Sequence, residues 1–103
     1  MAVKPITKEQ FDLLQPACKP MTRLMVEEHE WFAVEDGSFI GAVFYETAEH
    51  DWGWVIQGRE GQAEFRVVQM ISRLPNHDEA RTKLREEMTR REAAAKRVIP
   101  QVA

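Results

Sequence analysis

Residues 31–57 read WFAVEDGSFIGAVFYETAEHDWGWVIQ, and this stretch decides the fold class. Asp36-Gly37 stands between two apolar runs and is among the strongest short signals for a β-hairpin. Both central residues of a type I′ turn need a positive φ, which Gly tolerates freely and Asp better than most residues. The pattern therefore predicts that residues 31–35 and 39–45 pair as antiparallel strands.

Two further strands are predicted after this hairpin. The polar segment 47–51 fits a longer hairpin turn, and residues 52–57 follow as the third strand. Gly58 and Gly61 mark the next turn. Residues 64–71, which are rich in Phe and Val, are then expected to form the fourth strand.

The predicted sheet is apolar on both faces. Side chains alternate across a strand, so Trp54 and Ile56 share one face while Val55 lies on the other. An antiparallel sheet with one solvated face would instead alternate apolar and polar residues. We therefore expect both faces to be covered, by the chain's own helices or by another chain. Gly41 and Gly53 predict a bulge, a sharp bend or a close backbone approach within the strands.

Two short helices are predicted before the sheet. Thr7 and Gln10 match the capping-box pattern for the start of the first helix. Pro16 disfavours helical geometry in the residue before it, so the first helix is expected to end or kink there. Pro20 suits the first position of a second helix, which would run to about Glu28.

One long helix is predicted after the sheet, over residues 77–97. Asn76 is a good N-cap, and Glu79 completes a capping box three residues later. A narrow apolar stripe is expected at Ala80, Leu84, Met88 and Ala95. Acid-before-base pairs spaced i, i+4 are expected at Glu79–Lys83, Glu86–Arg90, Glu87–Arg91 and Glu92–Lys96.

Length and composition indicate one globular domain over residues 1–103, with 44% hydrophobic and 30% charged residues. No apolar run approaches the ~20 residues of a membrane-spanning helix, and the N-terminus lacks the apolar core of a signal peptide. The single cysteine, Cys18, cannot form an internal disulfide. Together these features predict a cytoplasmic location.

The charge is distributed unevenly along the chain. Residues 1–64 carry 5 Lys/Arg and 12 Asp/Glu, a net charge of −7, whereas residues 65–103 carry 9 Lys/Arg and 5 Asp/Glu, a net charge of +4. Either the basic helix lies over an acidic sheet or it faces an anionic partner. The acidic half holds most of the aromatic residues and would repel phosphate, so the sheet is not predicted to bind nucleic acid.

The histidine and acidic residues that could act in catalysis or bind a metal do not form a recognised motif. His29-Glu30, His50-Asp51 and His77-Asp78 pair an imidazole with a carboxylate, as a metal site could. Adjacent side chains point apart on a strand or helix, and no recognised ligand spacing is present. We therefore assign no catalytic residue, no metal ligand and no cofactor.

One family resemblance rests on two N-terminal helices followed by a hairpin of the form W-F-A-x-E-D-G-x-x-I-G-A-V and another strand. Over residues 7–60 this resembles the first half of a GNAT-type acetyltransferase, and it would imply acetyl transfer from an acyl-CoA. The family's pyrophosphate loop begins with Gln or Arg, whereas residues 58–63 read GREGQA. A strand is predicted after this loop in place of the family's helix, and no room remains for the cofactor-binding half. No functional residue is carried over.

The predicted fold is α+β. A four-stranded antiparallel meander over residues 31–71 is flanked by two short helices within residues 7–29 and by the C-terminal helix. The predicted function is a small, non-catalytic, cytoplasmic binding or regulatory module that self-associates, because the C-terminal helix offers too narrow a stripe to cover two apolar faces. The partner would be a second copy or another protein.

The expected ligand or partner surface comprises Trp31, Tyr45, Trp52 and Trp54. Two alternatives stay open. The first is a shortened acyltransferase-like protein. The second is a small-ligand-binding domain in which Trp52 and Trp54 line an apolar pocket between the sheet and the helices.

Overall fold

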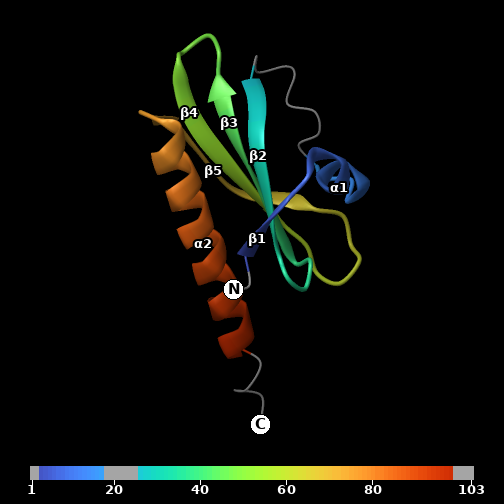
Figure 1. Ribbon diagram of the computed structural model, residues 1–103. Helices are drawn as coiled ribbons and strands as arrows, with labels where there is room; N and C mark the ends of the chain where they lie inside the picture. The colour runs from blue at the N-terminus through green and yellow to red at the C-terminus, as the bar shows by residue number, and fades with distance from the viewer. Residues whose placement is uncertain (1–2, 18–25, 99–103) are drawn as a thin grey trace.

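The computed structural model describes residues 3–17 and 26–98, and these form a five-stranded sheet with two helices (Figure 1). The elements in chain order are β1 Val3–Ile6, α1 Lys8–Leu13, β2 Val26–Val34, β3 Phe39–Glu46, β4 Asp51–Gly58, β5 Arg66–Leu74 and α2 His77–Val98. Every neighbouring pair of strands is antiparallel, and the order across the sheet is β1-β2-β3-β4-β5. The sheet order therefore repeats the order along the chain.

The prediction of an α+β fold with an antiparallel sheet and one long C-terminal helix is confirmed. The predicted strand count is wrong, because β1 adds a fifth strand by pairing with residues 31–34 of β2. The second N-terminal helix is wrong in its last part, where Val26–Glu28 belong to β2. The rest of that helix and Cys18 lie outside the described residues.

The β2–β3 hairpin is confirmed, but its turn is not of type I′. Only Gly37 has a positive φ, of 77°, and Asp36 does not. The Gly37 N–H donates to Val34 O over 3.0 Å, and Asp36 Oδ1 accepts hydrogen bonds from the Ser38 N–H and hydroxyl. Asp36 therefore stabilises the turn through its side chain, so a single left-handed residue is sufficient.

We expect Gly37→Val to lower the free energy of unfolding by about 1–2 kcal/mol, because a β-branched residue is strained at positive φ. Chemical denaturation measures the change. Glu35→Val is the matched control, since it adds the same side chain to the same turn at an exposed position without a positive φ. Equal stability of the two variants would contradict the left-handed assignment of Gly37.

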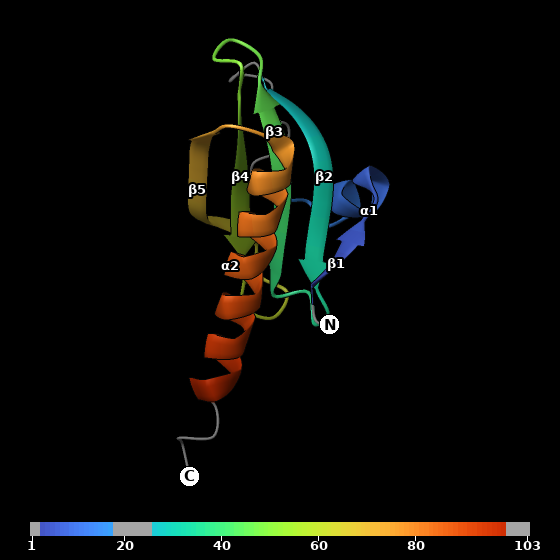
Figure 2. The ribbon, with the colours of Figure 1, turned by 60° about the vertical axis from the view of Figure 1, so that its left-hand side comes forward.

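Helix α2 covers one face of the sheet, which we call the α2 face. It packs mainly over β3 and β4 (Figure 2). Ala80, Leu84 and Met88 of the predicted stripe are fully buried there. Ala95 is exposed, and Glu92 takes the next inward position because four-residue steps from Met88 reach it. The strand residues beneath the helix include Phe32, Val34, Val43, Trp54 and Ile56.

The opposite face, which we call the α1 face, has its own core. Helix α1 lies on this side of the sheet (Figure 1), and its buried residue Phe11 packs in the same cluster as Phe65 of the β4–β5 loop. The strand residues of this cluster are Ala33, Ile40, Ala42, Phe44 and Val55, all buried. Both apolar faces are therefore covered within the chain over β2, β3 and β4.

The start of α1 carries the predicted capping box. The Gln10 N–H donates to Thr7 Oγ1 over 3.1 Å, and the Thr7 N–H donates to Gln10 Oε1 over 2.8 Å. The helix ends before Pro16, with Gln15 at a φ of 56°. Local signals thus determine both ends of this helix and place Phe11 on the sheet.

Candidate functional site

Most of the large apolar side chains that are exposed among the described residues lie on β5. Four large hydrophobic residues are exposed in the described part of the chain, and Val67 (44% exposed), Val68 (41%) and Met70 (46%) are three of them. The fourth, Leu13, is 81% exposed on α1. Because β5 is an edge strand, one of its backbone edges faces no other described strand. We call β5 and its exposed side chains the β5 margin.

Two bulges shape β5. The pairing with β4 skips one residue at Val68, and a second extra residue lies near Arg73, whose φ is 64°. Bulges bend an edge strand and interrupt the regular row of backbone donors and acceptors. The β5 margin is therefore suited to contacts through its side chains more than to a long, continuous ladder with another strand.

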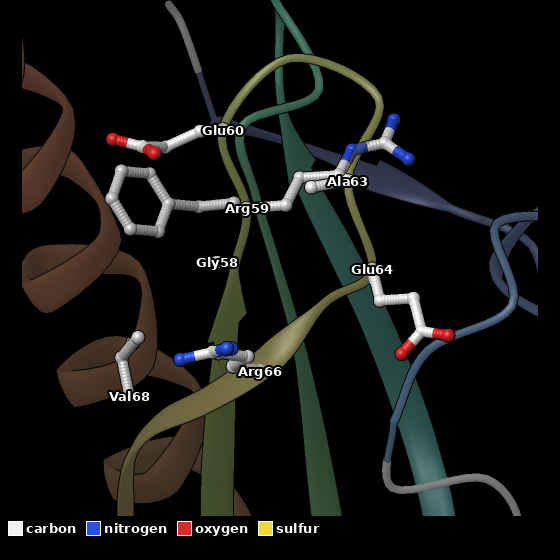
Figure 3. A pocket seen from close by; sticks show the side chains of 8 residues that line it. Gly58, Arg59, Glu60, Ala63, Glu64, Arg66 and Val68 are labelled. Atoms are coloured by element: carbon white, nitrogen blue, oxygen red, sulfur yellow. The ribbon is translucent and has the colours of Figure 1, made fainter.

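A hollow of about 470 Å³ opens beside the start of β5 (Figure 3). Its lining residues are Phe39, Gly58, Arg59, Glu60, Ala63, Glu64, Arg66 and Val68. In this view Glu60 and Val68 lie toward α2, whereas the Glu64 side chain points away from it. The Phe39 ring packs so closely over its cross-strand partner Gly58 that a Cβ there would lie 2.9 Å from the ring.

The two arginines that line this hollow differ in their contacts. The Arg59 guanidinium lies 4.3 Å from the centre of the Phe65 ring, and its Nε donates to Gly37 O over 3.2 Å. Arg66 is exposed and makes no ion pair with another described residue. The loop of residues 58–63 leads into β5 and not into a helix, as the sequence predicts.

A second depression, of about 520 Å³, runs between β5 and α2, and we call it the β5–α2 groove. Its lining residues are Trp54, Gln69, Ile71 and Leu74 from the sheet and Lys83, Glu86, Glu87 and Arg90 from the helix. The groove exists because α2 lies over β3 and β4 and makes few contacts with β5 (Figure 2).

Of the ion pairs predicted along α2, one that lines this groove forms and another does not. Glu87 forms the predicted ion pair with Arg91, over 3.0 Å. Arg90 bonds to Glu87 and not to Glu86. The hydrogen bond from Arg90 lowers the pKa of Glu87, so this carboxylate stays ionised while two guanidinium groups neutralise it.

Trp52 forms the centre of a cluster of rings near one end of the α2 face, which we call the Trp52 cluster. His77 stacks on its indole with centroids 4.6 Å apart, and His29 meets it edge-on at 4.9 Å. Tyr45 tilts against it at 5.0 Å, and the Tyr45 hydroxyl lies 3.1 Å from Nδ1 of His50. All three histidines of the chain therefore gather around Trp52 and Tyr45.

The expectation that adjacent histidine and acid side chains point apart is wrong at His29-Glu30. The pairing of β2 with β3 is shifted between Glu28 and Glu30, and this bulge turns both side chains to the α2 face. Glu30 contacts His77 Nε2 and accepts a hydrogen bond from Arg81 over 3.1 Å. The Glu30 contacts therefore tie the first turns of α2 to β2.

Acidic side chains meet on the α1 face at the same end of the sheet. Glu46 and Asp51 are directly opposite cross-strand partners on β3 and β4. Burial raises the pKa of Glu46, and the hydrogen bond and charge of Asp51 raise it further, while Arg73 opposes the shift. Within residues 3–17 and 26–98, no group of three His, Cys, Asp or Glu side chains is arranged to hold a metal ion.

We expect Glu46→Gln to stabilise the protein at neutral pH by less than about 1 kcal/mol, because it removes one of two opposed like charges. A carboxyl group with a raised folded pKa binds more protons in the native state, so stability falls as pH rises through the range between its unfolded and folded pKa values. The advantage of the variant should therefore grow with pH across that range and then level off. Denaturation at several pH values tests this, with the exposed Glu35→Gln as control. A less stable Glu46→Gln variant at neutral pH would contradict the account.

The four residues of the predicted partner surface do not lie together. Trp31 is half-buried on the α1 face, where its indole N–H donates to Glu28 over 3.2 Å. Tyr45 and Trp52 are neighbours in the Trp52 cluster. Trp54 is only 4% exposed and forms part of the floor of the β5–α2 groove.

Several features of these sites were not predicted from the sequence. The sequence singled out the three histidines but did not predict that they lie together around Trp52 and Tyr45, partly because the β2 bulge leaves no clear signal in the chain. The exposure of the β5 residues was not predicted, because the sequence of an apolar strand does not show whether the strand lies at the edge or in the centre of a sheet.

Within the described ranges, no helix combines the length and the apolar character needed to cross a membrane. No protein-family model, no curated protein and no solved structure matches this chain.

Proposed function

We propose that the chain is a small, cytoplasmic, non-catalytic binding module that associates with a second copy of itself through the β5 margin. The observation that carries this proposal is the gathering of Val67, Val68 and Met70 on an edge strand. Exposed apolar side chains that share one strand favour a protein contact more than the same residues scattered singly would.

The charges around β5 favour a second copy as the occupant. Glu64 precedes the strand and Arg73 lies near its end. A two-fold symmetric contact brings the same strand of both copies together in opposite directions. The start of each strand, which carries both Glu64 and Arg66, then faces the Arg73 end of the other, so Glu64 can pair with Arg73 twice while Met70 lies near the centre.

Light scattering behind a sizing column, across a concentration series, tests the proposal. We expect the wild-type chain to give the mass of a dimer and Met70→Lys to give that of a monomer, because the lysine would place a charge in the contact. Leu13→Lys is the matched control, since it charges an exposed large hydrophobic residue that lies outside β5 and should remain dimeric.

Two results would refute the proposal. A wild-type monomer at every concentration would exclude self-association under those conditions. A Met70→Lys variant that dimerises as well as Leu13→Lys would place the contact away from the β5 margin. Circular dichroism of both variants should match the wild type, because both substituted side chains are exposed in the folded chain.

A further inference from the structure

The β5–α2 groove has an apolar floor and a polar wall. Trp54, Ile71 and Leu74 form the floor on the sheet side. The wall consists of Lys83, Glu86, Glu87 and Arg90 on one flank of α2. At about 520 Å³, the groove is within the range of sites that hold small molecules, and such sites combine an apolar lining with a few polar groups.

The floor residue Trp54 carries a buried hydrogen-bond donor that has no acceptor in the described part of the chain. The indole Nε1 of Trp54 is buried and has no hydrogen-bond partner among the described residues. A buried donor left unpaired costs about 1–3 kcal/mol, and most buried tryptophans find an acceptor. This atom is closed to solvent, so a ligand acceptor would reach it when the groove opens slightly, and the new hydrogen bond would then remove this cost.

One cation of the wall, Lys83, has no ion-pair partner among the described residues. Glu87 forms ion pairs with both Arg90 and Arg91, and Arg91 also donates to the side chain of Gln69 on β5 over 2.9 Å. Lys83 is exposed and forms no ion pair or hydrogen bond with a described residue. Glu86 also lines the groove, and its carboxylate disfavours a ligand with more than one negative charge.

We infer that the β5–α2 groove binds a small molecule with an apolar body and a single carboxylate. The body would lie over Ile71 and Leu74, and the carboxylate would accept from the Trp54 indole and pair with the Lys83 ammonium. This inference does not require self-association, because every lining residue comes from one copy of the chain.

Sodium decanoate is a suitable probe, because it joins a flexible apolar chain to one carboxylate, and decylamine is its cationic match. Two-dimensional NMR resolves the indole N–H signals of the three tryptophans, and Trp54→Phe identifies the one from Trp54. We expect decanoate to shift the Trp54 signal and to slow its exchange with solvent, with much smaller effects on Trp31 and Trp52. Decylamine should bind at least about tenfold more weakly.

Two pairs of variants test the contacts by calorimetry. Lys83→Gln should weaken decanoate binding several-fold, whereas Lys4→Gln, which removes the same charge from β1, should not. Trp54→Phe removes the N–H donor and keeps an aromatic ring, so we expect about tenfold weaker binding, against no change for Trp52→Phe.

An unmoved Trp54 signal, equal binding of decylamine, or equal affinities for Lys83→Gln and Lys4→Gln would each overturn the inference. The titrations are run on the wild type and on Met70→Lys. If both proteins bind decanoate, whatever their mass in solution, then ligand binding in the groove does not depend on self-association.

Discussion

Replacing Trp54 with alanine should lower the free energy of unfolding by about 3–5 kcal/mol, the range typical of a large aromatic side chain removed from a core. Trp54 is 4% exposed and packs in the core beneath α2. Its removal would leave a cavity between β4 and the helix, which close-packed neighbours could fill only in part. Chemical denaturation followed by circular dichroism measures the loss without depending on tryptophan fluorescence.

Trp52→Ala provides the comparison for this result. Trp52 lies two residues away on the same strand, but it is only partly buried and packs against half-exposed imidazole rings. We therefore expect a smaller loss from Trp52→Ala than from Trp54→Ala. A loss below about 1 kcal/mol for Trp54→Ala would be incompatible with a place in the core.

The second large effect is expected for Gly53→Ala, at about 3 kcal/mol, the upper end of the usual range for overpacking. A Cβ at this position would lie 2.5 Å from Ile71 O and 2.7 Å from the Phe44 ring. The carbonyl belongs to the backbone of β5 next to a bulge, so the clash can be relieved only by moving that strand away from β4.

Gly58→Ala is the matched control on the same strand. A Cβ there would lie 2.9 Å from the ring of Phe39, which is partly exposed and can turn aside. We expect Gly58→Ala to lower stability by less than Gly53→Ala, measured as thermal or denaturant midpoints. Equal losses would mean that the close approach of Ile71 O does not restrict position 53.

Much of the sheet could be predicted because its signals are local. Asp36-Gly37 identifies a hairpin by itself, and alternation then assigns each strand residue to a face. Of the three alternatives predicted for Gly41 and Gly53, a bulge, a sharp bend or a close approach, the structure shows close approaches at both. Gly41 lies under Leu84 and Met88, and Gly53 lies against the backbone of β5. The capping box at Thr7 was equally visible, since cap and partner are only three residues apart.

Strand β1 could not be predicted, because its structure depends on a distant segment. Val3–Ile6 is short and contains Pro5, which argues against a central strand but is tolerated at an edge. It becomes a strand only by pairing with residues 31–34. Residues 26–28 likewise continued a helix-like spacing in the sequence, but pairing with β3 makes them part of β2.

The candidate sites were predictable only in part, since bulges and edges are properties of pairing. Trp54 was correctly placed on the same face as Ile56, yet its burial under α2 and its unpaired N–H depend on where the helix crosses the sheet. Val67 and Met70 look like core residues in the sequence. Their cross-strand partners, Gln57 and Val55, place them on the α1 face, and they are exposed because the cluster around Phe11 and Phe65 covers β2, β3 and β4 but not β5.

The strands have the same order across the sheet as along the chain, and this order has a consequence for how the molecule folds. From β2 to β5, each strand meets its partner across a short turn, so these four strands can assemble by successive local closures with little loop entropy to overcome. Strand β1 differs, because Val3 pairs with Val34 across the whole first third of the chain. We therefore expect β1 to join the sheet last during refolding. A chain emerging from the ribosome would then carry its N-terminal strand unpaired until β2 has been made.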